Sequence, residues 1–566
     1  MKHVGPISGI AVHGENLVAT AGYDNQIILW DAKSGDALGR GVHDHLANQC
    51  AFSPDGTLLV SASSDYSARL WSVPEMQLVS VLIGHSDDIE MAAFSPDGTK
   101  IATCSRDRKL SVFLVNGTRE TVFEGHEADV ISVAWSSDGT QLISSSDDGT
   151  IRRWDAENGT QLELIDLGGV ETDTVIITAD GVIYSGDDEG RISIFDGGKT
   201  RAIDAHGAGI KRLIYSASLG LLASLSYDKT IQIWKIKSNN DLALKQSSTF
   251  PTVVWPRSGA FLNSIEMVFG TFGSTFAVYN MASDKWDDSA VVGDDSINAV
   301  AFTKDGRRAW IGDAGICHFS DGTKVQVPSL CNFLLPVGKI IVSAGQTGDI
   351  YDVLTGDLLH THHSPVNCAT SFTSVDGTFV VLGTYTGEGV VLEVGADGRF
   401  KQHVKDIELH SNAVKGLSCD GTYIFSVSAD GGAGWHATSD LSAVEVLDDG
   451  HSMIANGCAT VRSGVFASVS RDLILRIWKD HKALEIETPH KNSIKCVCCT
   501  ENGRYIATGG YFGQIAIYDC KSGVWVRTVR QSASGISSIC TVPDQDAFLC
   551  SSYDGTVHFV SVQADF

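Results

Sequence analysis

The chain has 566 residues, 43 % of them hydrophobic, with 58 glycines and 11 prolines, and this composition is typical of a globular protein rather than a disordered or fibrous one. Its formal net charge of −26 argues against nucleic acid as a partner, because binding to phosphates depends on cationic side chains. No stretch has the apolar core of a signal peptide or the roughly 18 apolar residues needed to cross a membrane, so we expect no membrane partner. The 13 irregularly spaced cysteines favour a reducing, cytoplasmic compartment over a disulfide framework.

From the amino terminus onward, an aspartate stands six residues before an aromatic residue, as in Asp65 and Trp71. A serine or threonine stands four residues before that aspartate, and in four copies a histidine stands 22 residues before it. The aspartates with their hydroxyl residues are Asp24 and Thr20, Asp65 and Ser61, Asp107 and Thr103, Asp148 and Ser144, Asp228 and Ser224, and Asp472 and Ser468; the histidines are His43, His85, His126 and His206. Three fixed offsets from one residue indicate a repeated structural unit.

Hairpin signals separate these motifs. The segments FSPDGT at 52–57 and 94–99 and WSSDGT at 135–140 place Asp-Gly between short apolar runs, which predicts antiparallel strands. Following the aspartate position along the chain gives fourteen units at a spacing of about 41 residues. In the seventh to tenth units the motif is degenerate, for example Gly273 or Thr386 in place of Asp and Leu392 in place of Trp.

These motifs and their period resemble the WD40 repeats, which build four-stranded propeller blades. The resemblance implies an all-β fold of two tandem seven-bladed WD40 β-propellers with about 14 blades. We predict an N-terminal propeller over residues 1–292 and a C-terminal propeller over 293–566, joined near residues 291–296. Little sequence follows 558–563 to supply an outer strand, so we expect the last blade to have three strands or an unusual closure.

The resemblance also implies a hydrogen-bonded structural tetrad in each well-preserved blade. Two such sets are His126, Ser144, Asp148 and Trp154, and His206, Ser224, Asp228 and Trp234. The alternative is a hydrolase triad of His126, Ser144 and Asp148. A catalytic triad occurs once per active site rather than at a fixed repeat, and no G-x-S-x-G motif is present, so we predict no enzyme, no catalytic residue and no cofactor.

Three patterns suggest metal ligands. The histidine cluster HTHH covers residues 360–363, the cysteine run CVCC covers 496–499, and six Asp-Asp doublets occur in expected turns. Adjacent cysteines on a strand point to opposite faces, two of the histidines lie near the usual position of the tetrad histidine, and the doublets lack the ligand order of a calcium loop. We therefore expect no metal site.

The residue just before the motif aspartate lies in the turn between the second and third strands, at the face where WD40 proteins commonly bind partners. Tyrosine and arginine, the types that concentrate binding energy at interfaces, recur there. The predicted partner-binding residues are Tyr23, Arg106, Tyr227, Arg471, Tyr511 and Tyr553. The alternative is that they are ordinary turn residues. Trp286 and Trp435, outside the regular Trp position, are weaker candidates that we expect to pack against a blade or at the junction.

We therefore predict a non-enzymatic WD40 scaffold that assembles protein partners through rigid propeller faces. The layout is also similar to that of the actin-interacting protein family, whose tandem fourteen-repeat propellers act with cofilin on actin filaments. That family carries an extra amino-terminal segment, whereas here the repeats begin at once. Filament disassembly with cofilin is thus an alternative function, ahead of a propeller-based hydrolase.

Overall fold

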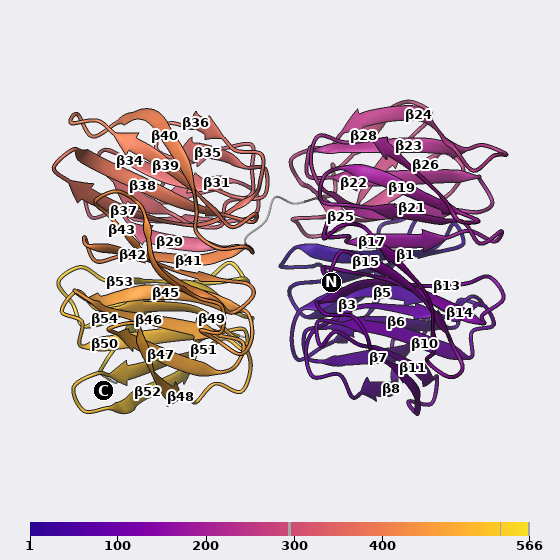
Figure 1. Cartoon of the computed structure of the whole chain (residues 1–566), viewed down its shortest axis with the longest axis horizontal. Helices are drawn as coiled ribbons and strands as arrows, with labels where there is room; N and C mark the ends of the chain where they lie inside the picture. Colours follow the sequence, from indigo (N-terminus) through magenta and orange to yellow (C-terminus); the bar gives the residue numbers. More distant parts are fainter. Residues whose placement is uncertain (292–295, 533, 564–566) are drawn as a thin grey trace. The chain divides into compact units, whose positions relative to one another are not determined.

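The computed structural model describes residues 1–291, 296–532 and 534–563. These residues form strands, turns and loops and contain no α-helix, so the all-β prediction is confirmed. Over the described range there is accordingly no helix long and apolar enough to cross a membrane. Figure 1 shows the strands joined by short loops throughout both parts of the chain.

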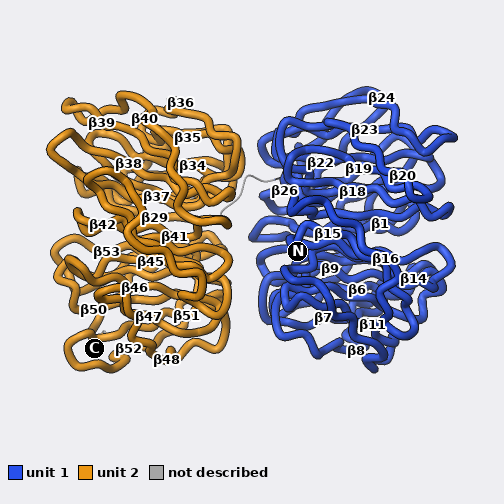
Figure 2. The backbone as a smooth tube through the Cα atoms, viewed as in Figure 1, with its two compact units in different colours: residues 1–293 blue, residues 294–566 orange. Residues whose placement is uncertain are grey.

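The chain divides into two compact units, Met1–Gly293 and Asp294–Phe566 (Figure 2). The predicted boundary between residues 292 and 293 falls within 292–295, outside the described residues. Each unit is described below by itself.

The first unit contains seven antiparallel sheets of four strands each. Its strands, sheet by sheet, are β1 (Ile7–His13), β2 (Leu17–Gly22), β3 (Gln26–Asp31) and β4 (Ala37–Val42); β5 (Ala47–Phe52), β6 (Leu58–Ser63), β7 (Ser67–Ser72) and β8 (Leu78–Ile83); β9 (Ile89–Phe94), β10 (Lys100–Ser105), β11 (Leu110–Leu114) and β12 (Arg119–Phe123); β13 (Val130–Trp135), β14 (Gln141–Ser146), β15 (Thr150–Asp155) and β16 (Gln161–Asp166); β17 (Thr174–Ile177), β18 (Ile183–Gly186), β19 (Arg191–Asp196) and β20 (Lys199–Asp204); β21 (Ile210–Ser216), β22 (Leu221–Ser226), β23 (Thr230–Ile236) and β24 (Leu242–Thr249); β25 (Val254–Phe261), β26 (Glu266–Thr271), β27 (Ala277–Asn280) and β28 (Lys285–Asp287).

The first strand of each sheet contacts the first strand of the next, and β25 contacts β1, so the seven sheets close into a ring. The backbone N–H of His3 donates to the carbonyl of Ser274 at 2.9 Å and ties the start of the first blade to the last blade. The first unit is therefore a seven-bladed propeller.

The second unit contains six sheets of four strands and a final sheet whose described residues form three strands. Its strands are β29 (Ala299–Phe302), β30 (Arg308–Ile311), β31 (Ile316–Phe319) and β32 (Lys324–Gln326); β33 (Leu335–Val337), β34 (Ile340–Ala344), β35 (Asp349–Asp352) and β36 (Asp357–Thr361); β37 (Val366–Ser374), β38 (Gly377–Thr384), β39 (Glu388–Val394) and β40 (Phe400–Glu408); β41 (Val414–Cys419), β42 (Tyr423–Ser428), β43 (Ala433–Ala437) and β44 (Ala443–Leu447); β45 (Ala455–Arg462), β46 (Val465–Ser470), β47 (Ile474–Lys479) and β48 (Lys482–Glu487); β49 (Ile494–Cys499), β50 (Tyr505–Gly510), β51 (Gln514–Asp519) and β52 (Val524–Arg530); β53 (Ile536–Thr541), β54 (Ala547–Ser552) and β55 (Val557–Ser561).

The second ring closes through contacts of β53 and β54 with β29. Within the described residues the last blade has three strands, as the sequence leads one to expect. Blades seven to ten, which the sequence supported by period and strand pattern alone, are also four-stranded sheets.

The hairpin turns form as their sequence predicts. In the turn between β5 and β6, the Asp55 carboxylate accepts hydrogen bonds from the Ser53 hydroxyl at 2.6 Å and from the Thr57 backbone N–H at 3.1 Å. Gly56 follows with a φ of 72°, a conformation that glycine adopts without strain. The turns at 94–99 and 135–140 repeat this arrangement, with the same Ser–Asp hydrogen bond.

The apolar core lies between neighbouring sheets. One cluster joins Val112 and Phe123 of one blade to Val133 and Trp154 of the next. The fourth strands are the outer ones, and β16 is mostly exposed, whereas β14 is buried over five of its six residues. The inner strands are thus held rigidly, and the loops at the two ends of each blade carry the accessible chemistry.

Candidate functional site

The fourth blade shows how the tetrad residues are connected. The Nδ1–H of His126 donates to Asp148 at 2.8 Å, and its Nε2 lies 2.8 Å from the Ser144 hydroxyl. The Trp154 indole N–H donates to the same Ser144 oxygen at 2.8 Å. Ser144 therefore donates its own proton to His126, and the chain of hydrogen bonds is complete with a neutral imidazole.

Ser144 is fully buried, with 0 % of its surface exposed, and Trp154 is 1 % exposed. Burial lowers the pKa of His126, because the charged imidazolium loses its hydration. Burial by itself would raise the pKa of Asp148, but the hydrogen bonds from His126 and Thr150 outweigh it and hold that pKa below its usual value. The Ser144 hydroxyl has no solvent access, so a substrate carbonyl has no path to it as it would need to reach a nucleophile.

The same arrangement recurs in other blades. His206, Ser224, Asp228 and Trp234 make the equivalent contacts, with His206 to Asp228 at 2.9 Å and Trp234 to Ser224 at 3.0 Å. In the sixth blade the hydrogen bond from His206 keeps the pKa of Asp228 at about 2 despite its burial. Further copies are His43 with Ser61, Asp65 and Trp71; His85 with Thr103 and Asp107; His3 with Thr20, Asp24 and Trp30; and His451 with Ser468, Asp472 and Trp478.

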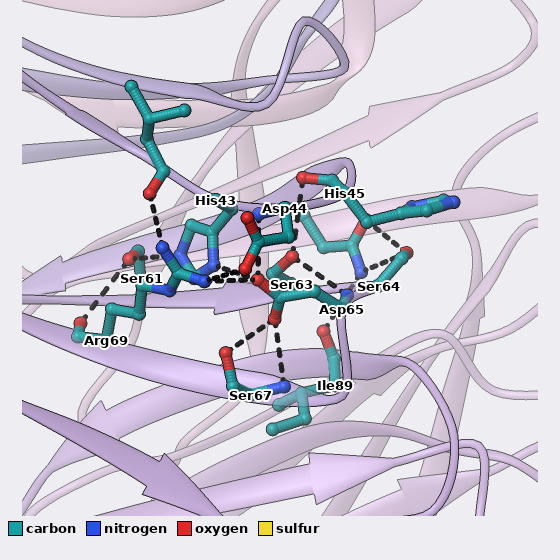
Figure 3. A network of polar contacts seen from close by, with 12 residues as sticks. His43, Asp44, His45, Ser61, Ser63, Ser64, Asp65, Ser67, Arg69 and Ile89 are labelled. Atoms are coloured by element: carbon teal, nitrogen blue, oxygen red, sulfur yellow. Dashed lines mark hydrogen bonds and ion pairs between the residues drawn. The ribbon is translucent and has the colours of Figure 1, made fainter. Parts of the chain in front are cut away.

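Figure 3 shows the copy in the second blade, where Asp65 accepts hydrogen bonds from the His43 side chain at 3.0 Å and the Asp44 backbone at 3.0 Å. Arg69 adds an ion pair to Asp65 at 3.1 Å. Each such aspartate thus fixes the loop that enters the blade to the turn between its second and third strands.

Sequence reasoning missed His3 and His451. Both stand 21 residues before their aspartate rather than 22, so a search at one fixed offset passes over them. Their distance from the inner strand would have identified them, because each precedes the first residue of β1 or β45 by four residues, as His126 precedes Val130.

The six predicted partner-binding residues occupy equivalent places. Each follows the second strand of its blade, and its backbone N–H donates to the residue just before the first strand of that blade, as Arg106 does to Asp88 at 3.0 Å. The other five pairs are Tyr23 to Pro6, Tyr227 to Gly209, Arg471 to Ile454, Tyr511 to Ser493 and Tyr553 to Gly535. Within each propeller they therefore lie at one face, which we call the turn face.

Their side chains differ in accessibility. Tyr23 packs edge-on against Trp255 at 5.2 Å between ring centroids, and Lys211 lies over the Tyr227 ring at 5.1 Å. In the second propeller Tyr511 and Tyr553 stack at 6.2 Å, and Tyr511 is only 8 % exposed. Tyr511 thus offers a partner less surface than the other five, all of which are partly exposed. Of the two other tryptophans singled out, Trp286 packs against Tyr279 of its own blade. Trp435 packs between blades, against Phe425 and against Trp478 of the next blade.

Arg106 is the centre of an ion-pair network on the turn face of the first propeller. Its guanidinium contacts Glu90 at 2.5 Å and Asp129 at 2.9 Å, and Arg257 reaches Glu90 from another blade at 3.4 Å. Lys211 forms a second set of ion pairs with Asp173 and Asp188. Seven carboxylates and three cations belong to this network, which we call the carboxylate cluster: Asp88, Glu90, Asp129, Asp147, Glu171, Asp173 and Asp188 with Arg106, Lys211 and Arg257.

Negative charge in this cluster exceeds what its cations neutralise. Burial and the carboxylates of Asp188 and Asp173 raise the pKa of Glu171 to about 7. Burial, together with Asp173 and Glu171, also raises the pKa of Asp147 well above its ordinary value. The sequence signal for this cluster was available, because Asp88, Asp129 and Asp173 all occupy the position just before an inner strand.

Comparison with known proteins agrees with this architecture. The family model described as "WD domain, G-beta repeat" matches residues 41–72, 76–113, 117–155, 197–235, 483–519 and 523–561. The chain is 42 % identical over 69 residues to WD repeat-containing protein 1 of Gallus gallus, covering 12 % of this chain and 11 % of that protein. It is 39 % identical over 70 residues to ribosome assembly protein 4 of Saccharomyces cerevisiae, covering 12 % and 14 %, and 37 % identical over 71 residues to the coronin-like protein crn1 of Schizosaccharomyces pombe, covering 12 % of each.

These matches thus span about an eighth of the length of each relative. The repeat model is found in both propellers, and the rings of sheets extend the same architecture through the segments between the matches. The chain therefore carries WD40 repeats in both of its propellers.

Proposed function

We propose that the protein is a non-enzymatic scaffold that binds protein partners through the turn faces of its propellers. Equivalent placement of tyrosine and arginine on these faces is the observation that supports the proposal most strongly. Because the backbone of each position is tied to its own blade, a partner would meet a surface that loses little conformational entropy on binding. A cytoplasmic setting is part of the proposal, and the thirteen cysteines, all free thiols within the described chain, support it.

The carboxylate cluster suggests the chemistry of the partner of the first propeller. The cluster holds seven carboxylates and three cations, and the pKa values of Glu171 and Asp147 are raised because further negative charge is unfavourable there. This excess of negative charge favours a docking segment that carries lysine or arginine. A cation placed among these groups would relieve their mutual repulsion. We therefore propose a basic segment of a partner protein as the ligand of this face.

Affinity capture of partners on the immobilised full chain, followed by mass spectrometry, tests the proposal. Charge reversal by Asp147→Lys with Glu171→Lys, and separately Arg106→Glu with Tyr227→Ala, should abolish capture of the partners that wild type retains. The matched control is Glu157→Lys, which reverses an exposed charge in the turn between β15 and β16 at the opposite end of the fourth blade. If both face variants still captured the partners and Glu157→Lys did not, the partner-binding surface would lie elsewhere.

A second proposal is actin-filament disassembly together with cofilin. The two closed rings of seven blades support it, since this is the layout of the actin-interacting protein family. Sedimentation of actin filaments with cofilin, with and without the protein, distinguishes the two proposals. An increase in unsedimented actin that requires both cofilin and the protein favours this function, and no increase rejects it.

A further inference from the structure

His362 occupies the tetrad histidine position in a blade that has lost the tetrad. It lies four residues before the first residue of β37, as His126 does before β13. Leu382 stands where the tetrad has a hydroxyl, and Thr386 stands where it has the aspartate. Neither of the two partners that hold the imidazole in other blades is therefore available to His362.

The imidazole of His362 turns instead toward Glu388 and His363. Its Nε2 lies 3.3 Å from Glu388 Oε2, and the Nε2 of His363 lies 3.7 Å from the same oxygen. Ligand atoms of all three residues lie within 4.8 Å of one another. His362 is only 5 % exposed, and its buried Nε2 has no hydrogen-bond partner among the described residues, because the contact with Glu388 is not aligned as a hydrogen bond. A buried ring nitrogen without a partner costs free energy unless something else satisfies it.

We propose that His362, His363 and Glu388 bind a Zn²⁺ ion. Zinc takes imidazole nitrogen and carboxylate oxygen at about 2.0–2.1 Å in tetrahedral geometry, which sets neighbouring ligand atoms about 3.3 Å apart. The two measured separations from Glu388 Oε2 are close to this value. Binding through Nε2 would satisfy the buried nitrogen of His362 and bring the two histidines and the glutamate into one coordination shell.

Neighbouring groups orient these ligands. The Thr386 hydroxyl donates to Glu388 Oε2 at 2.8 Å, so the residue that replaced the aspartate holds the carboxylate in place. The backbone carbonyl of Ser364 lies 3.4 Å from His362 Nδ1, with the Ser364 N–H at 3.1 Å. Because the Ser364 N–H donates to Nδ1, the neutral ring carries its proton on Nε2. Zinc binding at Nε2 would therefore shift that proton to Nδ1, where the Ser364 carbonyl is the nearby acceptor.

The site is accessible on one side. The side chain of His363 is 68 % exposed and that of Glu388 is 36 % exposed, so an ion can enter without opening the blade. Three protein ligands leave a fourth position for water or for a side chain of a bound protein. This proposal departs from the sequence expectation of no metal site at HTHH, because Glu388 lies 26 residues from His362 in the sequence and only the fold brings it to the histidines.

Isothermal titration of the full chain with ZnCl₂, after removal of bound metal by a chelator, tests the assignment. Wild type should bind one Zn²⁺ per chain at this site, and His363→Ala and Glu388→Gln should each weaken that binding at least about tenfold. Both substituted side chains are partly exposed, so these variants should unfold at the wild-type temperature without metal. Co²⁺ in place of zinc should give the intense visible absorption of tetrahedral coordination in wild type and lose it in both variants.

The matched control is His403→Ala on β40. His403 also contacts a carboxylate, Asp406, at 2.9 Å, but this pair belongs to no group of three possible ligands in the described structure. This variant should keep wild-type affinity. Equal zinc binding by wild type, His363→Ala and Glu388→Gln would overturn the proposal and assign any bound zinc to other groups, such as the thiols. An equal loss of affinity in His403→Ala would also contradict the assigned ligands.

Discussion

At the scale of single residues, the tetrad histidine shows how surroundings decide what a side chain does. His126 and His362 occupy the same place in their blades, but one is held by Asp148 and Ser144 and the other faces Glu388. The residues of the apparent triad are thus bonded to one another within their blade. At His362, where the tetrad hydroxyl and aspartate are absent, the imidazole faces Glu388 in the proposed zinc site. Intact tetrads leave their polar atoms fully occupied.

Replacing Ser144 with alanine should destabilise the first propeller. The change leaves the Trp154 N–H and the His126 Nε2 buried without partners, at a cost of about 1–3 kcal/mol. Thermal unfolding followed by circular dichroism should show a lower midpoint. Ser137→Ala, an exposed position in the preceding turn, serves as control and should leave the midpoint nearly unchanged. If Ser144→Ala melted like the control, the hydrogen bonds would not carry this stability.

Glu171 gives a pH-dependent prediction. Because its pKa is raised to about 7, its proton stabilises the folded state below that pH, and this stabilisation is lost as the pH rises through about 7. The variant Glu171→Gln, which cannot ionise, should therefore melt about 2–4 °C higher than wild type at pH 8. At pH 4, below the ordinary carboxyl pKa of 4.5, the two proteins should melt alike. A gain in melting temperature that is the same at both values, or absent at pH 8, would show that Glu171 is not held protonated.

At the scale of strands and blades, the ends of the first ring are joined by His3. Its backbone binds Ser274 of the last blade, while its side chain binds Asp24 and Thr20 of the first. Each inner strand packs mainly on the inner strands of its two neighbouring blades. His3 therefore joins the first blade to the last one at the place where the ring closes.

Removing the His3 side chain should loosen that closure. We expect His3→Ala to speed amide hydrogen exchange in β1 and β25 and to leave exchange in β13 unchanged, because β13 lies away from the junction. The measurement is mass-spectrometric hydrogen exchange of the folded variant. Uniformly faster exchange throughout the first propeller would instead indicate a general loss of stability.

At the scale of the whole molecule, the repeat count, the fold class and the tetrads could be predicted from the sequence, because Asp, Ser, His and Trp recur at fixed offsets. The sequence indicated part of the carboxylate cluster, because Asp88, Asp129 and Asp173 share the position just before an inner strand, but Glu171 lies outside that position. The proposed site at His362 was missed because Glu388 stands on the third strand, 26 residues after His362, an interval that no tetrad partner shares.

The central claim is that the turn face of the first propeller is the surface that binds a partner. Hydrogen exchange of the full chain, measured with and without a captured partner, tests it most directly. The proposal predicts protection in the turns at residues 22–25, 105–108 and 226–229 and no change in the opposite turns at 53–57, 95–99 and 136–140. Protection confined to the opposite turns, with the turn face unchanged, would contradict it.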